Sequence, residues 1–299
     1  MGARLTDPSH RPVDHAALIA GVCSFTLWGL FPLFFQAVGR AGAASGEVVV
    51  WRILASLPVC ALIVLLAREG GAVRELLRDR RRLAALGLSG AMIGINWGVY
   101  VWAVQHGQVL ATSLGYYINP LLNMAVGAWL FRERLSLSAR AALALAIVGV
   151  ALQAVAIGGA PWIALILASS FCAYGVIRKQ VPVAPQTGLM VETALLAVPC
   201  MGFLVWQAGH GGGAFGRDPL ATALLLASGP VTVVPLLAFS VAARRLTLTL
   251  LGFLQFIQPT IVFFLGTVSG EPLSPLKLAS FGFIWLGVAV FVGGAWRRR

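Results

Sequence analysis

The chain has 299 residues, of which 59% are hydrophobic and only 11% are charged, with a mean hydropathy of +0.88. An ordinary soluble domain is nearer half apolar and about a quarter charged, so this composition excludes a water-soluble globule, and its hydrophobicity excludes intrinsic disorder. A formal net charge of +12 would suggest a nucleic-acid partner in a soluble protein. In a membrane protein the same charge is expected on cytoplasmic loops. We therefore expect an all-α integral membrane protein.

Ten apolar runs along the chain are near the roughly 20 residues that cross about 30 Å of hydrocarbon as a helix. They lie at 16–38, 46–67, 83–104, 109–131, 137–157, 161–177, 188–207, 220–241, 247–268 and 274–296. Most of the linking loops are short, which predicts one compact bundle of ten transmembrane helices. The first run holds Trp28 and Pro32 and lacks a small-residue cleavage site, which argues against a signal peptide.

The basic side chains predict an orientation for these ten helices. The N-terminal tail and alternate loops hold 18 Lys and Arg residues, and the opposite loops hold three, which are Arg40, Arg217 and Lys277. This bias places residues 1–15 and the basic tail 297–299 in the cytoplasm. Because the positive charge is scattered over loops on one side, we expect no nucleic-acid partner.

The chain repeats itself at about half its length, with offsets of 146, 139 and 138 residues between matching segments. The matches pair SFTLWG (24–29) with SFCAYG (170–175), YINP (117–120) with FIQP (256–259), and ERLS (133–136) with EPLS (271–274). Each half has five spans, so the second repeat, 161–296, must enter the membrane upside down relative to the first, 16–157. Inverted-topology repeats are typical of secondary transporters, whose substrate site lies near mid-membrane where the halves meet.

Several motifs resemble the RarD proteins, which belong to the EamA branch of the drug/metabolite transporter superfamily. The motifs are NWG (96–98), ATSLGYYINPLLN (111–123), RER (132–134), QTG with ET (186–188 and 192–193), TVVPL (232–236), and LGF with QFI (251–253 and 255–257). The resemblance covers about 17–296. It implies two EamA-like repeats, cytoplasmic termini and a bacterial inner (cytoplasmic) membrane location, without fixing a substrate.

Two charged residues fall inside the expected spans, at equivalent helices of the two halves. Arg52 lies several residues into the second span and Glu192 a few residues into the seventh. A charge inside a span is costly, so it is expected to face a cavity or a partner. The alternatives are that both snorkel to the interface, or that Glu47 pairs with Arg52 on its own helix. Glu192 is also a candidate for proton coupling, because a desolvated carboxyl group holds its proton more tightly.

The fourth and ninth spans combine a proline with amide side chains. On the fourth, Tyr116, Asn119 and Asn123 share one face with Thr112, beside Pro120. The ninth repeats this arrangement with Gln255, Gln258 and Pro259. Amides both donate and accept hydrogen bonds, which suits a small polar or zwitterionic solute. The prolines are candidate hinges, and interhelical hydrogen bonding is the alternative role for the amides.

Aromatic residues and glycines complete the predicted path. Asn96, Trp97 and Tyr100 on the third span are candidate walls, and Trp28 and Tyr174 are equivalent in the repeat. Gly90, Gly94 and Gly98 make a stripe on the third span, which is compatible with packing inside the bundle or with a homodimer.

The sequence lacks the motifs of metal sites, hydrolases and ATPases. The four cysteines lie in apolar runs without metal-ligand spacing, the four histidines lie outside the spans, and neither HExxH, GxSxG nor Walker A occurs. The letters GxGxxG at 211–216 follow no strand and open no βαβ unit, so a linker is favoured. We expect no metal, no cofactor and no enzymatic activity.

The sequence therefore predicts a secondary active transporter, a permease, exporter or exchanger that works by alternating access. Its partners would be the lipid bilayer and a small metabolite or drug-like solute. Sugar phosphates are disfavoured, because they would need several converging basic side chains. The alternative is a membrane-embedded lipid-handling protein or an enzyme without a recognisable catalytic motif.

Overall fold

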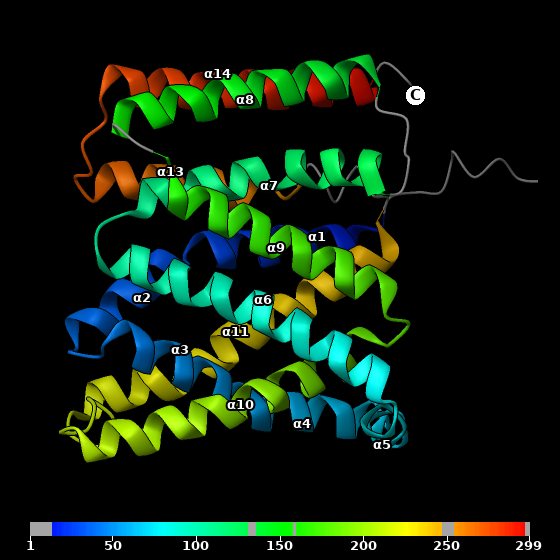
Figure 1. Cartoon of the computed structure of the whole chain (residues 1–299), viewed down its shortest axis with the longest axis vertical. Helices are drawn as coiled ribbons and strands as arrows, with labels where there is room; N and C mark the ends of the chain where they lie inside the picture. Colours follow the sequence, from blue (N-terminus) through cyan, green and yellow to red (C-terminus); the bar gives the residue numbers. More distant parts are fainter. Residues whose placement is uncertain (1–13, 131–135, 158–159, 247–253, 297–299) are drawn as a thin grey trace, which may run out of the picture.

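The computed structural model describes residues 14–130, 136–157, 160–246 and 254–296, and these residues are helical apart from their connections (Figure 1). The elements in chain order are α1 (His15–Gly29), α2 (Phe31–Arg40), α3 (Ser45–Leu54), α4 (Ser56–Leu66), α5 (Gly70–Arg78), α6 (Arg80–Gln105), α7 (Val109–Leu130), α8 (Leu137–Ile157), α9 (Trp162–Gln180), α10 (Pro185–Gly209), α11 (Pro219–Arg245), α13 (Ile257–Val268) and α14 (Pro275–Trp296). Long helices run back and forth across one bundle, and α8 and α14 lie together along one edge of it (Figure 1).

Seven helices of the described part are long and apolar enough to cross a membrane. They are His15–Arg40, Ser45–Leu66, Arg80–Gln105, Leu137–Ala156, Pro185–Gly209, Pro219–Phe239 and Pro275–Gly294. Trp162–Arg178 and Ile257–Val268 are shorter apolar helices. The chain is thus an all-helical, multi-pass membrane protein, while the count of ten spans stays a prediction.

The first two expected spans are each interrupted, at Leu30 and at Ala55. A proline removes one backbone donor and its ring clashes with the carbonyl four residues earlier. Pro32 and Pro58 follow the two breaks closely, and the carbonyl four residues before Pro58 belongs to Leu54, the last residue of α3. Each proline therefore favours a break at its position, but a proline alone does not force one, because α7, α10 and α11 continue through their own internal prolines.

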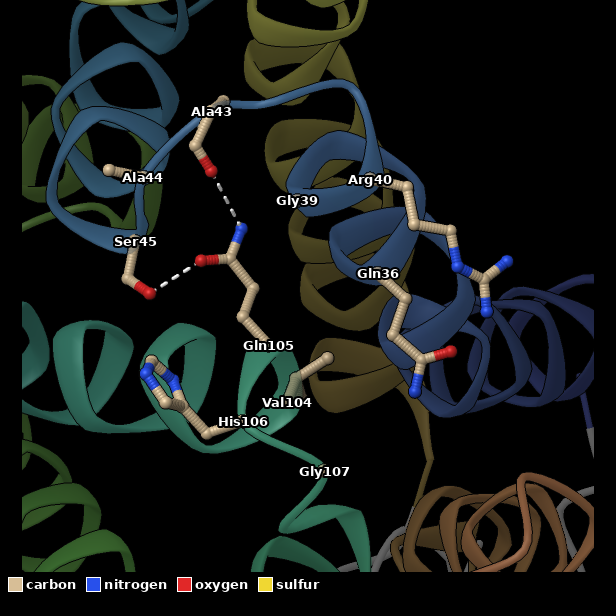
Figure 2. Close-up of a pocket in the computed structure, with 10 residues that line it drawn as sticks. All are labelled: Gln36, Gly39, Arg40, Ala43, Ala44, Ser45, Val104, Gln105, His106 and Gly107. Atoms are coloured by element: carbon tan, nitrogen blue, oxygen red, sulfur yellow. Dashed lines mark hydrogen bonds between the residues drawn. The ribbon is translucent and has the colours of Figure 1, made fainter.

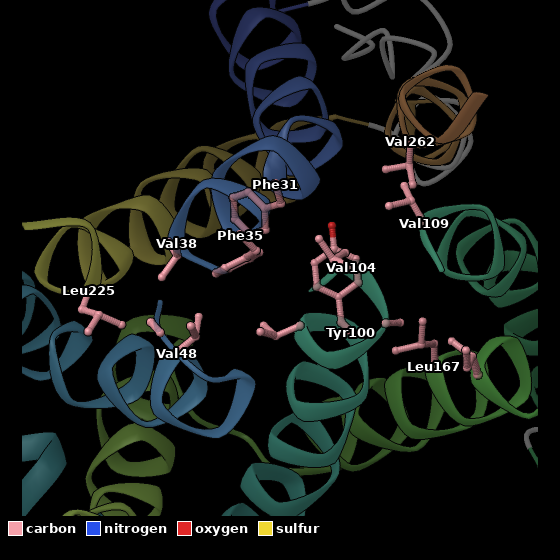
Figure 3. Packing of buried hydrophobic residues seen from close by; sticks show 14 residues of the cluster. Phe31, Phe35, Val38, Val48, Tyr100, Val104, Val109, Leu167, Leu225 and Val262 are labelled. Atoms are coloured by element: carbon pink, nitrogen blue, oxygen red, sulfur yellow. The ribbon is translucent and has the colours of Figure 1, made fainter. Parts of the chain in front are cut away.

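One large apolar cluster holds helices from both halves of the chain together. It includes Phe31, Phe35, Val48, Tyr100 and Leu167, with further members from α11 and α13 (Figure 3). These side chains are almost fully buried. The cluster joins α2, α3 and α6 of the first half to α9, α11 and α13 of the second.

Two of the three glycines in the stripe on α6 pack against a neighbouring helix. A Cβ at Gly90 or Gly94 would contact Leu196 of α10 at 3.5 or 3.4 Å, whereas at Gly98 nothing lies within 4 Å. Of the two roles left open for the stripe, these two glycines take the packing role.

Candidate functional site

A buried arginine lies at the centre of the candidate site. Arg52, on α3, is only 3% exposed, so its charge does not reach the interface as the snorkelling alternative requires. Its Nε donates a hydrogen bond to Thr232 Oγ1 of α11 at 2.8 Å, and Thr232 Oγ1 in turn donates to Ser228 O at 2.8 Å. An arginine at a helix centre costs about 2.5–3.5 kcal/mol on insertion scales, so a buried one needs compensation.

Three aromatic rings provide part of that compensation. The guanidinium carbon of Arg52 lies 4.2 Å from the ring centre of Trp97, 5.2 Å from Phe35 and 5.3 Å from Phe31. Cations at such distances are attracted by the negative face of the ring. The rings do not accept hydrogen bonds from the N–H groups at the edge of the guanidinium, however. Arg52 Nη1 is buried without a hydrogen-bond partner.

The alternative prediction, in which Glu47 pairs with Arg52, is wrong. Glu47 is buried, but its carboxylate accepts hydrogen bonds from the backbone N–H groups of Ala214 and Phe215, at 3.0 and 2.9 Å. The Phe215 ring stacks on Trp51 at 3.7 Å. A Cβ at Gly213 would lie 2.2 Å from the Glu47 carboxylate, so only glycine permits this approach. The glycine-rich segment after α10 is thus anchored on the start of α3.

Tyr100, Tyr116 and Asn96 continue the site away from Arg52. The Tyr100 hydroxyl is buried without a partner, and its ring lies 5.8 Å from that of Tyr116. Asn96 Nδ2 donates to Leu167 O at 2.9 Å and to Ser170 Oγ at 3.1 Å, while Tyr116 OH donates to Asn96 Oδ1 at 3.4 Å. The amide donors of Asn96 are therefore used to join α6 to α9, and its oxygen orients Tyr116.

A second buried charge lies on α10. Glu192 is 1% exposed. Ser89 Oγ of α6 donates to Glu192 Oε1 at 2.7 Å, and Arg178 Nη1 of α9 lies 3.6 Å from the same oxygen. Glu192 Oε2 is buried without a hydrogen-bond partner. Arg178 reaches this position over Gly188, where a Cβ would lie 1.8 Å from Nη1.

The remaining predicted site residues are dispersed. Trp28 packs against Phe25 and Phe239 at 5.4 and 5.6 Å between ring centres, in a cluster of α1 and α11. Tyr174, its repeat equivalent, interacts instead with Glu192 and Arg178. Asn119 is buried on α7, and the side chain of Asn123 lies outside the described residues.

The proline-containing helices contact each other directly. Ser113 Oγ of α7 donates to Pro259 O of α13 at 2.7 Å, and the hydroxyls of Tyr117 and Thr260 share a hydrogen bond of 2.7 Å. Pro120 lies within a continuous α7, and Pro259 lies in the first turn of α13. Gln255 and Gln258 are half-buried at that turn.

Three residues of the two charged clusters were missed by sequence reasoning, namely Thr232, Ser89 and Arg178. The repeat itself held a signal for two of them. Arg52 and Glu192 are separated by 140 residues, and Ser89 and Thr232 by 143, which are offsets within the range of the matching segments. A search for polar residues at equivalent positions of both halves would have paired them.

A pocket of about 570 Å³ opens beyond the apolar cluster, between the ends of α2 and α6 and the start of α3 (Figure 2). The Gln105 side chain crosses it, donating to Ala43 O at 3.3 Å and accepting from Ser45 Oγ at 2.5 Å. Val104 lines the pocket and belongs to the apolar cluster. The cluster therefore separates the pocket from Arg52, which lies two turns farther along α3.

Comparisons with known proteins identify the family. Residues 15–155 match the family model of the EamA-like transporter family. A protein of Pseudomonas aeruginosa called an uncharacterized transporter is 43% identical over 93% of this chain and 94% of its own. The protein RarD of Streptomyces exfoliatus is 38% identical over 95% of this chain and 90% of its own. The chain belongs to the RarD family of EamA-like transporters. The family predicted from the motifs is thus confirmed, and with it a membrane transporter of the drug/metabolite superfamily.

A solved crystal structure shares the fold of this RarD-family chain. It superposes with a TM-score of 0.59 over 95% of this chain and 99% of its own, at 22% sequence identity.

Proposed function

We propose that the protein is a secondary active transporter that moves a small metabolite or drug-like solute by alternating access. Ten spans in two inverted repeats, 16–157 and 161–296, would carry the motion, with both termini in the cytoplasm and the bundle in a bacterial inner membrane. The protein would have no enzymatic activity. The family model matches residues 15–155, which is close to the expected bounds of the first repeat.

The observation that carries the proposal is a pair of buried charges at equivalent positions. Arg52 and Glu192 are each the eighth residue of their helix, about 10 Å from its start at 1.5 Å per residue. The two helices, α3 and α10, run in opposite directions across the bundle (Figure 1). The two charges therefore lie nearer opposite ends of the bundle.

Each charge is bonded to a hydroxyl of the other half of the chain. Arg52 binds Thr232, and Glu192 binds Ser89. A relative motion of the two halves must break or exchange these bonds. Because unpaired buried polar groups are costly, the bonds favour discrete positions of the halves, and a solute that replaces one of them would shift the balance between those positions.

The solute path would run between these charges along α6. Trp97 and Tyr100 line it beside Arg52, and Tyr116 lines it from α7 with its hydroxyl held by Asn96. The pocket at Gln105 and Ser45 would be one mouth, closed in this conformation by the apolar cluster (Figures 2 and 3).

Glu192 would couple transport to protons. In its charged form it attracts Arg178 and accepts from Ser89, and a proton on the carboxyl group weakens its attraction for Arg178. Protonation would therefore loosen α10 from α9 and α6, the three helices that this cluster joins.

The test is counterflow in proteoliposomes with radiolabelled amino acids, nucleosides and chloramphenicol. We expect at least one solute to exchange saturably and to be accelerated by an imposed proton gradient. Glu192→Gln should abolish the acceleration, while Glu75→Gln, exposed on α5, should preserve it. Equal acceleration in the Glu192→Gln variant would refute proton coupling at this residue, and flux without saturation for every solute would refute the transporter.

A further inference from the structure

We propose that Arg52 binds the carboxylate group of the transported solute, which is therefore a small monoanion or zwitterion with an apolar or aromatic part. This inference rests on the proposed transport function and names the chemical class of its substrate.

The surroundings of the Arg52 guanidinium leave one of its hydrogen-bond donors without an acceptor. Thr232 holds Nε, and the faces of Trp97, Phe35 and Phe31 surround the cation. Nη1 nevertheless remains a buried donor without an acceptor. A carboxylate oxygen is the strongest complement to such a charged donor, and the planar guanidinium is well suited to it.

No carboxylate of the described chain provides that complement. Among the described residues, the ion pairs join Arg82 to Asp79, Arg178 to Glu192 and Arg245 to Asp14, and none includes Arg52. Glu47 shares helix α3 with Arg52 but binds the backbone of the segment after α10. A carboxylate on a bound molecule would supply the counter-charge that these described residues leave out.

The surroundings of Arg52 restrict that molecule further. Arg52 is the one cation that the described residues place within these three rings. A phosphate group would call for several converging basic groups. The Tyr100 hydroxyl is a second buried group without a partner. Its ring lies 6.1 Å from that of Phe35, one of the three rings around Arg52, and the hydroxyl can donate to the same anion. Trp97, Phe31 and Phe35 surround these donors with ring surface, which favours an apolar or aromatic body on the carboxylate.

The experiment compares a matched acid and amide, 3-phenylpropanoate and 3-phenylpropanamide, by thermal unfolding of the full chain in detergent. We expect the acid to raise the melting temperature of the wild type saturably, and the amide to leave it unchanged. Arg52→Gln should lose the rise, and Arg52→Lys should weaken apparent affinity by about tenfold or more, because lysine keeps the charge without the planar fork.

Arg74→Gln is the matched control, because Arg74 is an exposed basic residue on α5, outside the proposed path. It should keep the full rise with the acid. The inference is overturned if the amide stabilises the wild type as much as the acid, if neither does, or if Arg74→Gln alone removes the effect. The acid–amide comparison in the wild type holds even where an Arg52 variant fails to fold.

Counterflow separates this inference from the transport function. Saturable exchange of neutral solutes, without competition by 3-phenylpropanoate, would keep the transporter and overturn the carboxylate site. Arg52-dependent binding of the acid, with unsaturable flux of every solute, would keep the site and overturn the transporter.

Discussion

Close backbone approach fixes the contact of α11 with the break between α3 and α4. A Cβ at Gly229 would lie 2.2 Å from the carbonyl oxygen of Ala55, the residue at which the second expected span is interrupted. Thr232, three residues farther along α11, holds Arg52. A glycine that positions this part of α11 thereby positions the partner of the buried charge.

We expect Gly229→Ala to lower the free energy of unfolding by about 1–3 kcal/mol, the usual cost of overpacking. Gly202→Ala on α10 is the matched control, because nothing lies within 4 Å of its added Cβ and alanine favours a helix over glycine. Thermal unfolding in detergent measures both. Equal stability of the Gly229→Ala protein and the wild type would contradict this packing.

Sequence reasoning found the chemical groups of the site better than their partners. Arg52 and Glu192 stood out because a charge in an apolar run is rare and costly. Thr232 and Ser89 did not, since hydroxyls are common in spans and only the fold brings them within 2.8 and 2.7 Å of the charges. The alternative that Glu47 pairs with Arg52 does not hold, because the partners of Glu47 are 167 and 168 residues away, and positions along one helix give no sign of them.

At the scale of elements, an acidic residue ties the connection before α14 to the start of α7. Glu271 accepts hydrogen bonds from the backbone N–H groups of Val109 and Leu110, at 2.6 and 3.0 Å. These N–H groups have no partner within their own helix. Burial raises the pKa of Glu271 above its ordinary 4.5, and the two backbone hydrogen bonds offset part of that rise.

This pKa has a consequence for stability. Between about pH 4.5 and the raised pKa, the folded state keeps a proton that the unfolded state has released, so the unfolding free energy contributed by Glu271 falls as pH rises. Glu271→Gln should remove this part of the slope, measured by unfolding from pH 4.5 upward. Identical slopes in both proteins would contradict the assignment, and Glu75→Gln on α5 is the exposed control.

The sequence predicted most helices but not their interruptions. Apolar runs near 20 residues locate membrane helices well, and the long helices fall where these runs lie. Hydropathy does not register backbone geometry, however. Pro32 and Pro58 accompany breaks, whereas α10 continues through Pro199. Whether a proline breaks a helix depends on what its neighbours satisfy, which only the packed bundle determines.

At the scale of the whole molecule, the charge bias predicts an orientation. His106, between α6 and α7, should face away from the cytoplasm, and Glu75, on α5, should face it; both are exposed. Single cysteines at these positions, in a chain whose native cysteines are replaced by alanine, should react oppositely with a membrane-impermeant thiol reagent in right-side-out vesicles. We expect labelling at position 106 alone. Labelling at position 75 alone would contradict the predicted orientation and indicate the opposite one.

Alternating access requires the two halves to separate at one end of the bundle and then at the other. The most direct measurement locks one end. A Cβ at Gly266 of α13 would lie 3.0 Å from Leu110 Cγ of α7, so cysteines at these two positions join the halves beside Glu271. The controls are the two single-cysteine proteins, Leu110→Cys and Gly266→Cys, in a chain whose native cysteines are replaced by alanine, because neither can form a disulfide within one chain.

We predict that oxidation of the Leu110→Cys, Gly266→Cys protein stops counterflow and that a reductant restores it, while each single-cysteine protein transports in both states. Undiminished counterflow through the oxidised Leu110→Cys, Gly266→Cys protein would contradict alternating access between the two halves.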